Sequence, residues 1–544
     1  MRRWNGWGDD SISMALPHSA EMFLQQELGT AKPLTDISLV DATAKVPATR
    51  LTALQQQQFT WLSIDKEQRL RHAKGQSLPD WLAMRSGDID NFPDAVAFPE
   101  NRQDIQNLLQ WSQQENIELI PYGGGTSVAG HINPEKSERC IVTVDMSRLN
   151  QLHHLDEQSQ IATFGAGTMG PMVEAQLRAK GYTLGHFPQS FELSTIGGWV
   201  ASRSSGQQSL RYGRIEQLFA GGIMETYAGA LEIPTFPASA AGPDFREIVL
   251  GSEGRFGIIS EVKVRVSKLP EKEQFAVVFF PNWQQATHFC KDIAQQRIQL
   301  SMLRVSNSQE TQTQLKLAGH ENSIKWLERY LSIRGAKQQK CMLTFGLTGS
   351  KTQIAASKKQ LKPLLKKYHG VSTGSLLGKR WNENRFKFPY LREALWEKGV
   401  VVDTLETATD WQNVDNLMAK VENSLATGLP SNEKVHVFTH LSHVYGQGCS
   451  LYTTYLFCNG KDHQQTLNHW KILKHAASKV IVENGGTISH QHGVGKDHAP
   501  YLAVEKGQQG MKLLAGLCQH FDEKNLLNPN TLISSDDCSY NKKP

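Results

Sequence analysis

The chain has 544 residues, with 58 lysines and arginines against 53 aspartates and glutamates, a formal net charge of +5. This length allows two or three domains with sizeable cores. No run of five like charges occurs, which argues against the electrostatic footprint of a nucleic-acid-binding protein. No stretch approaches the roughly 18 apolar residues of a membrane span, and the first residues lack an apolar signal core. Seven cysteines without metal-type spacing indicate free thiols, so we expect a cytoplasmic protein.

The first part of the chain, residues 1–90, is polar and rich in glutamine. Helices are predicted over 20–28 and 53–74. Trp4 and Trp7 lie close to the start of the sequence, and a pair of tryptophans there predicts an N-terminal segment that is docked on the protein. We expect residues 1–90 to form a helical extension.

From residue 92 onward, apolar runs of strand length alternate with amphipathic stretches of helix length. Strands are predicted at 95–99, 117–120, 141–145, 160–164 and 256–266, and helices at 102–116 and 171–180. After Pro270 the pattern restarts, with strands at 275–280, 302–305, 340–347, 435–439 and 451–458 and helices at 283–296, 322–336, 354–368 and 464–483. The second series is typical of a separate α+β domain built on one sheet with antiparallel partners. We expect domains over 91–270 and 271–515, with residues 516–544 returning to the first of them.

Residues 121–127 read Pro-Tyr-Gly-Gly-Gly-Thr-Ser and follow a predicted strand. Consecutive glycines permit positive φ and let a backbone lie directly against a bulky group. Free N–H groups, together with the hydroxyls of Thr126 and Ser127, suit the oxygens of a phosphate. The alternative is an ordinary glycine-rich surface turn.

A second glycine loop, Gly165-Ala-Gly-Thr-Met-Gly170, has the GxGxxG form between a predicted strand and a predicted helix. A dinucleotide-binding Rossmann unit would require a second strand that ends in an acidic residue about 20 positions later. Residues 181–190 are instead broken by glycine and proline. The pattern therefore favours a tight strand-to-helix turn.

Residues 189–213 are dense in small and hydroxyl-bearing side chains, which can donate hydrogen bonds to a nearby ligand. A flexible linker is the alternative, but Phe191, Ile196 and Trp199 predict that this segment is packed.

The motifs PYGGGTSVAG, GHFPQSFELSTIGGWVASRSSG, GSEGRFGIISEV and SHQHGVGK, in this order, resemble those of the PCMH-type FAD-binding oxidases, also called the vanillyl-alcohol oxidase superfamily. Within it, RWNGWG, FPYLREAL, DTLETATDW and DEKNLLNPNTL resemble the alkyldihydroxyacetonephosphate synthases, and the likeness extends from Arg3 to about Leu532. It implies an α+β enzyme with a two-subdomain PCMH-type FAD-binding domain and an α+β cap domain that has an antiparallel sheet. Nothing in the sequence requires a covalent flavin link, so we expect FAD to be bound without one.

The resemblance assigns cofactor contacts to several segments. It places the FAD pyrophosphate against Pro121, Tyr122, Gly123, Gly124, Gly125, Thr126 and Ser127. The other matched positions are His186, Gln189, Ser190, Phe191, Glu192, Leu193, Ser194, Thr195, Ser202, Arg203, Ser204, Ser205, Glu253, Gly254, Arg255, Phe256, Gly257, Ile258 and Ile259.

In the cap domain the resemblance makes Arg392 the substrate arginine, whose guanidinium fork suits a phosphate group; a generic helical arginine is the alternative. Tyr452 matches the catalytic tyrosine, although Tyr455 lies near and the residues alone do not choose between them. Arg304 matches an arginine needed for activity, and His490 and His492 are candidate proton carriers.

The implied reaction exchanges the acyl chain of acyl-dihydroxyacetone phosphate for a fatty alcohol through a flavin N5 adduct. One alternative is an FAD-linked oxidase or dehydrogenase of a D-2-hydroxy acid or related alcohol, and another is a flavin-binding module without catalysis. We expect a lipid-like phosphorylated small-molecule substrate, no nucleic acid and a homodimer, with a peripheral membrane contact left open.

Two departures from related motifs matter. The synthases carry three adjacent histidines where this chain has His490-Gln491-His492, and an amide cannot move a proton near neutral pH. The hydroxy-acid dehydrogenases bind a metal through a GHxGDGNxH motif and the glutamate of EHGxG. Here His440 and His443 remain, but the Asp-Gly-Asn core and the acidic ligand do not. We therefore expect no metal site and interpret these histidines as hydrogen-bonding or proton-transfer groups.

Overall fold

The computed structural model describes residues 2–319 and 321–534. A small sheet with the strand order β1-β2-β4-β3 begins the predicted FAD-binding part. Strands β2, β4 and β3 are parallel, and β1 pairs antiparallel with β2. Both faces of the parallel strands are covered, which explains their continuous apolar sequences. The strands span Leu62–Ser63 (β1), Ala95–Ala97 (β2), Glu118–Tyr122 (β3) and Ile141–Asp145 (β4), and the helix α6, Arg102–Glu115, precedes β3.

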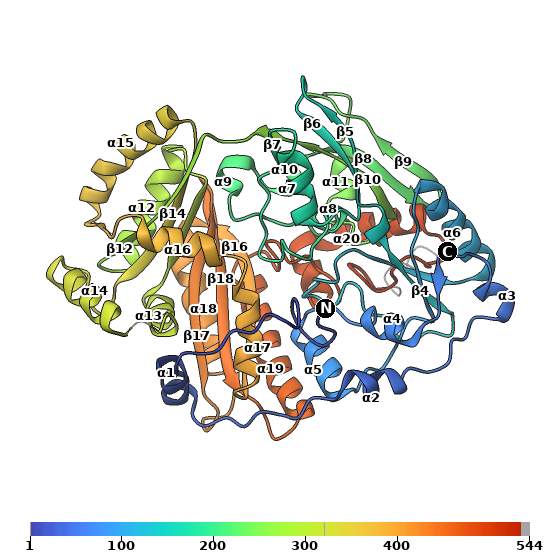
Figure 1. The fold of residues 1–544 in the computed structure, drawn as a ribbon, viewed down its shortest axis with the longest axis horizontal. Coiled ribbons are helices and arrows are strands. Elements are labelled where there is room, and N and C mark those ends of the chain that lie inside the picture. Colours follow the sequence, from blue (N-terminus) through green and yellow to red (C-terminus); the bar gives the residue numbers. More distant parts are fainter. Residues whose placement is uncertain (1, 320, 535–544) are drawn as a thin grey trace.

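An antiparallel sheet of five strands, β5-β6-β10-β8-β9, lies beside the small sheet (Figure 1). Helices α7, α8 and α20 bury their apolar residues against it in one core. The GxGxxG loop joins β6 to α7 as a tight turn, because a Cβ atom on Gly167 would lie 1.7 Å from the Met146 carbonyl oxygen. The elements are β5 (Leu152–Asp156), β6 (Ile161–Gly165), β8 (Phe219–Thr226), β9 (Gly229–Ile233), β10 (Ile258–Arg265), α7 (Gly170–Arg178), α8 (Ile196–Ser202), α9 (Ser209–Tyr212), α10 (Ile215–Leu218), α11 (Arg246–Val249) and α20 (Ala499–Phe521), with the short pair β7 (Tyr182–Thr183) and β11 (Ser267–Lys268).

The cap is built on a sheet of seven strands in the order β15-β12-β14-β13-β17-β18-β16, and every neighbouring pair in it is antiparallel. The expected antiparallel cap sheet is confirmed. Its strands are β12 (Lys272–Phe280), β13 (Met302–Ser306), β14 (Cys341–Gly349), β15 (Val371–Ser372), β16 (Val400–Asp410), β17 (Val435–Val444) and β18 (Gly448–Cys458). Its helices are α12 (Trp283–Gln295), α13 (Ser308–Leu317), α14 (Glu321–Ile333), α15 (Lys351–Lys367), α16 (Leu376–Asn384), α17 (Leu391–Trp396), α18 (Val414–Ala426) and α19 (His463–Glu483).

The N-terminal residues connect both parts. Trp7 is buried in the cap core, as the tryptophan pair predicts, and Arg2 donates to the Gly124 carbonyl oxygen over 2.6 Å. The single helix predicted over 53–74 is wrong. This stretch forms α3 (Ala53–Gln56), the strand β1 and α4 (Lys66–Arg71), because Phe59 and Trp61 pack on Trp111 between them. The remaining helices here are α1 (His18–Leu28), α2 (Leu39–Ala44) and α5 (Leu78–Ser86).

Beyond α20 the chain returns to the glycine-loop strand. Leu119 of β3 donates its N–H to Leu526 and accepts from Asn528 through its carbonyl. Arg255 forms a fully buried ion pair with Asp522 at 2.8 Å, and Asp522 also accepts from the N–H groups of Leu526 and Leu527. Among the described residues, no helix has both the length and the apolar character needed to cross a bilayer.

Replacing Asp522 with alanine should destabilise the protein by about 3–5 kcal/mol, because the substitution removes the carboxylate that balances the buried charge of Arg255 and leaves the backbone donors of Leu526 and Leu527 without their acceptor. Denaturant unfolding of the purified protein measures the change. The exposed pair Arg148–Glu100 provides a matched control, and Glu100→Ala should cost about 1 kcal/mol or less. Equal losses from the two substitutions would contradict the structural role assigned to Asp522.

Candidate active site

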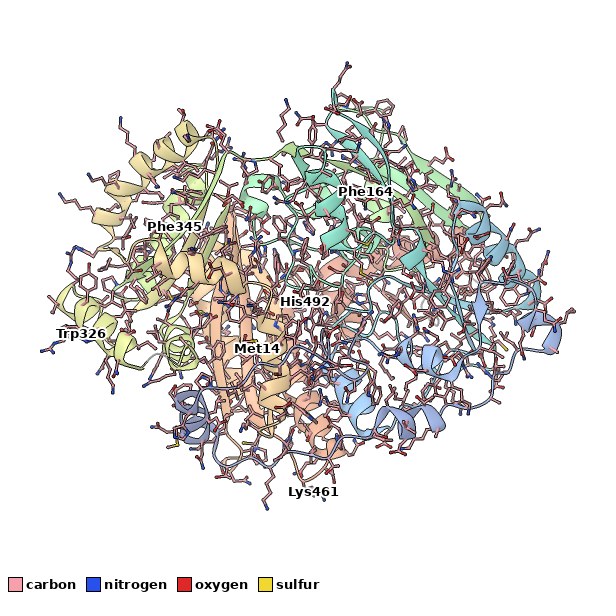
Figure 2. The ribbon with its side chains drawn as sticks, viewed as in Figure 1. Met14, Phe164, Trp326, Phe345, Lys461 and His492 are labelled. Atoms are coloured by element: carbon pink, nitrogen blue, oxygen red, sulfur yellow. The ribbon has the colours of Figure 1, made fainter. Side chains whose placement is uncertain are left out.

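A cavity of about 540 Å³ lies between the glycine loop and the cap sheet. One wall consists of the loop after β3 and the segment that leads into α8. The other wall consists of residues from β16, β17 and β18 and from the helices α13 and α17. Figure 2 places His492, which lines this cavity, near the centre of the molecule.

The glycine loop is held by a very close approach of two backbones. A Cβ atom on Gly124 would lie 1.7 Å from the Leu193 carbonyl oxygen, and one on Gly123 would lie 2.4 Å from Thr195 Oγ1. Gly125 has φ of +65°, where its Cβ would meet the Tyr122 hydroxyl. The sequence argument expected a cofactor to fill the space beside Gly124. In the direction of a side chain on Gly124 this space is filled by the Leu193 carbonyl, whereas Gly124 itself lines the cavity, so contact of its backbone with the cofactor stays a prediction.

The cavity wall fits a cofactor that carries phosphates and hydroxyls. Ser205 Oγ and Gln207 Oε1 are buried there without a hydrogen-bond partner among the described residues. Gly198 is exposed to the cavity, and a Cβ atom there would meet only Thr195 Oγ1, at 3.2 Å. The predicted cofactor residues that line the cavity are Pro121, Tyr122, Gly123, Gly124, Gly125, Thr126, Ser127, Gln189, Ser190, Ser194, Thr195, Ser202, Ser204, Ser205, Glu253, Gly254, Gly257, Ile258 and Ile259.

Some predicted cofactor residues do not line the cavity because they pack into the protein. Phe191 and Phe256 belong to the core of the five-stranded sheet, and Phe191 stacks on Phe386. Leu193 packs against the cap core, although its carbonyl touches the glycine loop. His186 lies behind the wall, where its Nε2 is 2.7 Å from the Ser204 hydroxyl. Burial lowers the pKa of His186 to about 3, so the ring is neutral.

Three charged residues in the predicted set are committed to protein partners instead of the cavity. Glu192 accepts a hydrogen bond from the Tyr390 hydroxyl. Arg203 forms an ion pair with Glu247 at 2.9 Å. Arg255 forms the buried pair with Asp522 described above. These side chains therefore fix the wall segments in place without facing the cavity.

The cap sheet presents a row of polar side chains to the cavity. Tyr452 of β18 stands directly opposite Glu406 of β16 and His440 of β17, so the three side chains share one face of the sheet. The rings of Tyr452 and His440 stack with centroids 4.7 Å apart. Tyr455 points to the other face, where its hydroxyl donates to Asp403. The structure thus selects Tyr452 over Tyr455 as the cavity residue.

Tyr452 remains protonated at neutral pH. Burial raises its pKa to about 12, and its hydroxyl lies 3.3 Å from Thr404 Oγ1. His492 approaches it edge-on, with ring centroids 6.0 Å apart. Burial lowers the pKa of His492 and of His440, so both imidazoles are neutral and can accept a proton. The row therefore combines a protonated phenol with neutral bases.

Arg304 is held by a carboxylate that the sequence did not reveal. Its Nη2 lies 2.6 Å from Glu310 of α13, whose other oxygen lies 3.0 Å from His440 Nδ1. Burial alone would raise the pKa of Glu310, but the charge of Arg304 and the hydrogen bonds from Arg304 and from the neutral His440 outweigh it and lower the pKa to about 2. Arg304 and His440 line the cavity together with Glu310. Glu310 thus orients both of them.

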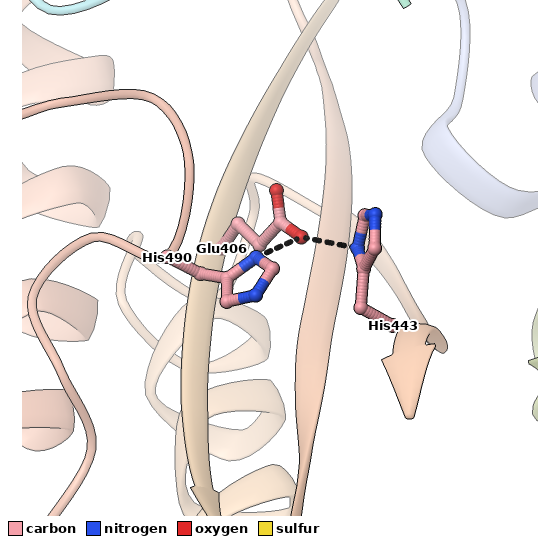
Figure 3. Close-up of side chains that lie close together, drawn as sticks. All are labelled: Glu406, His443 and His490. Atoms are coloured by element: carbon pink, nitrogen blue, oxygen red, sulfur yellow. Dashed lines mark hydrogen bonds and ion pairs between the residues drawn. The ribbon is translucent and has the colours of Figure 1, made fainter. Parts of the chain in front are cut away.

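A second carboxylate, Glu406, lies behind the row and gathers the remaining histidines (Figure 3). His490 Nδ1 lies 3.0 Å from Glu406 Oε1 and His443 Nδ1 lies 3.7 Å from the same oxygen. Glu406 Oε2 lies 3.8 Å from His492 Nε2. His490 itself does not line the cavity, and its role as a proton carrier stays a prediction.

Glu406, His443 and His490 lie close enough together that an ion could in principle sit among them. The hydrogen bonds of His490 oppose this. Arg214 Nη1, which can only donate, lies 2.7 Å from His490 Nε2, so the proton of the neutral ring is on Nδ1, facing Glu406. Burial lowers the pKa of His490 to about 4. An imidazole that is protonated on Nδ1 and accepts from a guanidinium on Nε2 is a poor metal ligand, and the cluster is better described as a hydrogen-bonded group of buried side chains next to His492.

Arg392 of α17 points into the cavity from the cap side. Its Nη1 donates to the Gln76 carbonyl over 2.7 Å, and its guanidinium carbon lies 3.9 Å from the Trp81 ring centroid. Its Nη2 is buried with no hydrogen-bond partner among the described residues. Burial lowers its pKa to about 10, which leaves it charged at neutral pH. An unpaired donor of this kind suits an anionic group of a ligand.

One end of the cavity is apolar. Side chains from α1, α13, α17, β17 and β18 form it, and they include no charged group. They are Leu24, Leu317, Leu391, Leu395, Phe438 and Leu456. Together with the polar row and the glycine loop, this end makes the cavity amphipathic. Nothing in the sequence pattern indicated it, because the six residues come from five separate elements.

The cavity face of α8 provides a test of cofactor binding. Gly198→Leu should give a folded protein that purifies without the yellow colour of FAD, because the side chain enters the cavity while the packing behind it is unchanged. Absorbance of the purified protein measures the flavin content. Gly516→Leu on α20 is the matched control, since a Cβ atom there meets nothing within 4 Å. Full flavin content in Gly198→Leu would contradict the assignment of this wall.

The family models match both parts of the chain. Residues 93–224 match the FAD binding domain, and residues 269–532 match the C-terminal domain of FAD linked oxidases. A curated relative, the alkyldihydroxyacetonephosphate synthase of Dictyostelium discoideum, is 29% identical over 585 aligned positions, which cover 100% of this chain and 95% of the relative.

Solved structures agree with this assignment. An alkyldihydroxyacetonephosphate synthase superposes with a TM-score of 0.83 at 27% identity, over 97% of this chain and 98% of the other. p-Cresol methylhydroxylase superposes with a TM-score of 0.67 at 12% identity, over 88% of this chain and 94% of the other, and shares the fold. The chain belongs to the PCMH-type family of FAD-linked oxidases and is an FAD-dependent enzyme similar to alkyldihydroxyacetonephosphate synthase.

Proposed function

We propose that the enzyme exchanges the acyl chain of an acyl-dihydroxyacetone phosphate for a fatty alcohol. One observation carries this proposal. A single cavity joins the glycine loop, the unpaired Arg392 donor, the phenol–imidazole row and an apolar end. Such a cavity offers a separate place for each part of a phosphorylated, chain-bearing substrate. The similarity to the synthases named above supports the same substrate class.

Arg392 is the residue that would bind the phosphate. Its Nη2 is the unpaired donor, while the contacts with Gln76 and Trp81 hold the guanidinium plane in one orientation. A guanidinium held in this way is already ordered, so binding an anion costs little side-chain conformational entropy. The acyl or alkyl chain would occupy the apolar end, which is lined by leucines and a phenylalanine.

The exchange breaks the bond between the substrate carbon and the leaving carboxylate, forms a bond between that carbon and the alcohol oxygen, and involves no net oxidation. When bound, FAD supplies the redox-active ring system that supports chemistry at this carbon. The alcohol must lose a proton, and the neutral His492 or His440 can accept it. Because burial raises the pKa of Tyr452 to about 12, its hydroxyl keeps its proton at neutral pH and can donate a hydrogen bond to a substrate oxygen. Gln491 also lines the cavity, but its amide only forms hydrogen bonds.

The experiment that tests the proposal supplies the holoenzyme with acyl-dihydroxyacetone phosphate and a labelled long-chain alcohol. We expect an alkyl product and an equal amount of fatty acid, with no net change in flavin absorbance at the end of the reaction. A panel of hydroxy acids is tested in parallel. Flavin bleaching by a hydroxy acid, together with no exchange of chains, would replace the proposal with a dehydrogenase function.

Tyr452→Phe should reduce the exchange rate by at least about a hundredfold while the flavin content stays the same, because only the hydroxyl that faces Thr404 is lost. Steady-state rates and flavin absorbance measure the two effects. Tyr501→Phe on α20, whose hydroxyl lies 2.7 Å from His475 outside the cavity, is the matched control and should be as active as the parent. An active Tyr452→Phe enzyme would remove Tyr452 from the mechanism.

Arg392→Lys should raise KM for the phosphorylated substrate by about tenfold to a hundredfold, because a lysine keeps the charge but loses the fork. The effect on kcat should be smaller, and flavin content should not change. Arg380→Lys, on the exposed surface of α16, is the matched control. Loss of flavin or of solubility in Arg392→Lys would show instead that Arg392 holds the fold.

A further inference from the structure

Residues 75–77, which lead into α5, lie between the glycine loop and the cap arginine Arg392. The Gln76 N–H donates to the Ser127 carbonyl oxygen over 2.6 Å, and the Gln76 carbonyl accepts from Arg392 Nη1 over 2.7 Å. Gln76, Ser127 and Arg392 all line the cavity. One residue of the N-terminal extension therefore joins the end of the glycine loop to the guanidinium on the cap side.

The side chain of Gln76 fixes the ring on which Arg392 lies. Its Oε1 accepts from Trp81 Nε1 over 2.8 Å, and its Nε2 donates to the Gly6 carbonyl oxygen over 3.2 Å. Gln76 and Trp81 are both buried, and the Trp81 ring centroid lies 3.9 Å from the guanidinium carbon. A guanidinium at this distance is attracted to the face of the ring. Gln76 thus holds Arg392 in two ways, through its own carbonyl and through the Trp81 ring.

The contact between residues 75–77 and the glycine loop is tight. A Cβ atom on Gly75 would lie 2.7 Å from the Ser127 carbonyl oxygen and 3.1 Å from Asp80 Oδ2. Asp80 accepts from the Ser77 N–H in the capping box of α5 and from Asn133, which follows the glycine loop in sequence. The start of α5 is therefore bonded to the glycine-loop side of the cavity at more than one point, and a shift of the loop moves this segment with it.

We propose that Gln76 is a positioning residue through which FAD at the glycine loop and a phosphate group at Arg392 strengthen each other's binding. When bound, FAD fixes the glycine loop, the loop fixes Gln76 through Ser127, and Gln76 holds Arg392 in the orientation that presents Nη2 to an anion. A bound phosphate group in turn slows the release of FAD, because the coupling of two binding sites is reciprocal. This coupling rests on the proposed function, since it takes Arg392 as the residue that binds phosphate.

The test uses the purified holoenzyme and glycerol 3-phosphate, a phosphate monoester without an acyl chain to exchange. Release of FAD into buffer is followed by flavin fluorescence, with and without this probe, and titration calorimetry measures binding of the probe itself. We expect the probe to slow FAD release by at least about fivefold, the lower end of typical couplings between sites. Glycerol, which has the same carbon skeleton but no phosphate, should leave the rate unchanged.

Two variants test whether the coupling runs through residues 75–77. Gly75→Ala places a methyl group against the Ser127 carbonyl and should reduce the effect of the probe on FAD release to less than about twofold. Gln76→Leu keeps the backbone bonds but removes the acceptor of Trp81 Nε1, and it should weaken the effect as well. Gly516→Ala on α20 is the matched control, since its Cβ meets nothing within 4 Å, and it should respond like the parent.

The outcomes separate this coupling from the proposed function. Binding of the probe without any effect on FAD release would overturn the coupling and leave the proposed function standing. Absence of probe binding would overturn both, because Arg392 would then not be a phosphate site. An effect on FAD release that persists in full in Gly75→Ala and in Gln76→Leu would overturn the role of Gln76.

Discussion

A very close approach of two backbones, at Gly124 and the Leu193 carbonyl, sets the architecture of the cofactor side of the cavity. The glycine loop belongs to β3 of the parallel sheet, whereas Leu193 belongs to the segment that enters α8 on the five-stranded sheet. Their contact joins the two sheets at one point, and no residue with a side chain can replace Gly124 without moving them apart. The hydroxyls of Ser190, Ser194 and Thr195 reach the cavity only because this segment is held against the loop.

The cap side depends on a different constraint, the register of β16, β18 and β17. Pairing of Tyr452 with both Glu406 and His440 places a phenol between a carboxylate and an imidazole on one face of the sheet. Two carboxylates next to these side chains hold further partners, since Glu310 pairs with Arg304 and Glu406 pairs with His490. A one-residue shift of β18 would turn Tyr452 away from the cavity and bring the opposite face of the strand toward it.

Most residues on the glycine-loop side of the cavity could be named from the sequence, because their motifs resemble those of a known family, whereas consecutive glycines and clustered hydroxyls alone left a surface turn or a linker open. The cap site could be predicted only in part. Strand β16 was not predicted, since Asp403, Thr404, Glu406 and Thr407 interrupt its apolar pattern. Asp403 and Thr404 line the cavity, whereas Glu406 does not. Glu406 was missed with it.

Other residues could not be placed because their roles depend on tertiary contacts. Tyr452 and Tyr455 are three positions apart and so point to opposite faces of a strand, and only the fold shows which face borders the cavity. His490 matched a family position, but its place behind Glu406 follows from Arg214, which is remote in sequence. Arg203 and Arg255 lie within motifs that border the cavity, but their side chains point away from it and form ion pairs with Glu247 and Asp522.

The hydrogen bonds between Leu119 and residues 526–528 have a consequence for biosynthesis. Strand β3 and the glycine loop emerge from the ribosome early, but the segment that pairs with β3 is translated long afterwards. Arg255, in another wall segment, likewise can form its buried ion pair only after Asp522 has been translated. The cofactor side of the cavity therefore stays incomplete during most of the synthesis of the chain. Cofactor binding becomes a late step of maturation, because it follows the pairing of the C-terminal residues 526–528 with β3.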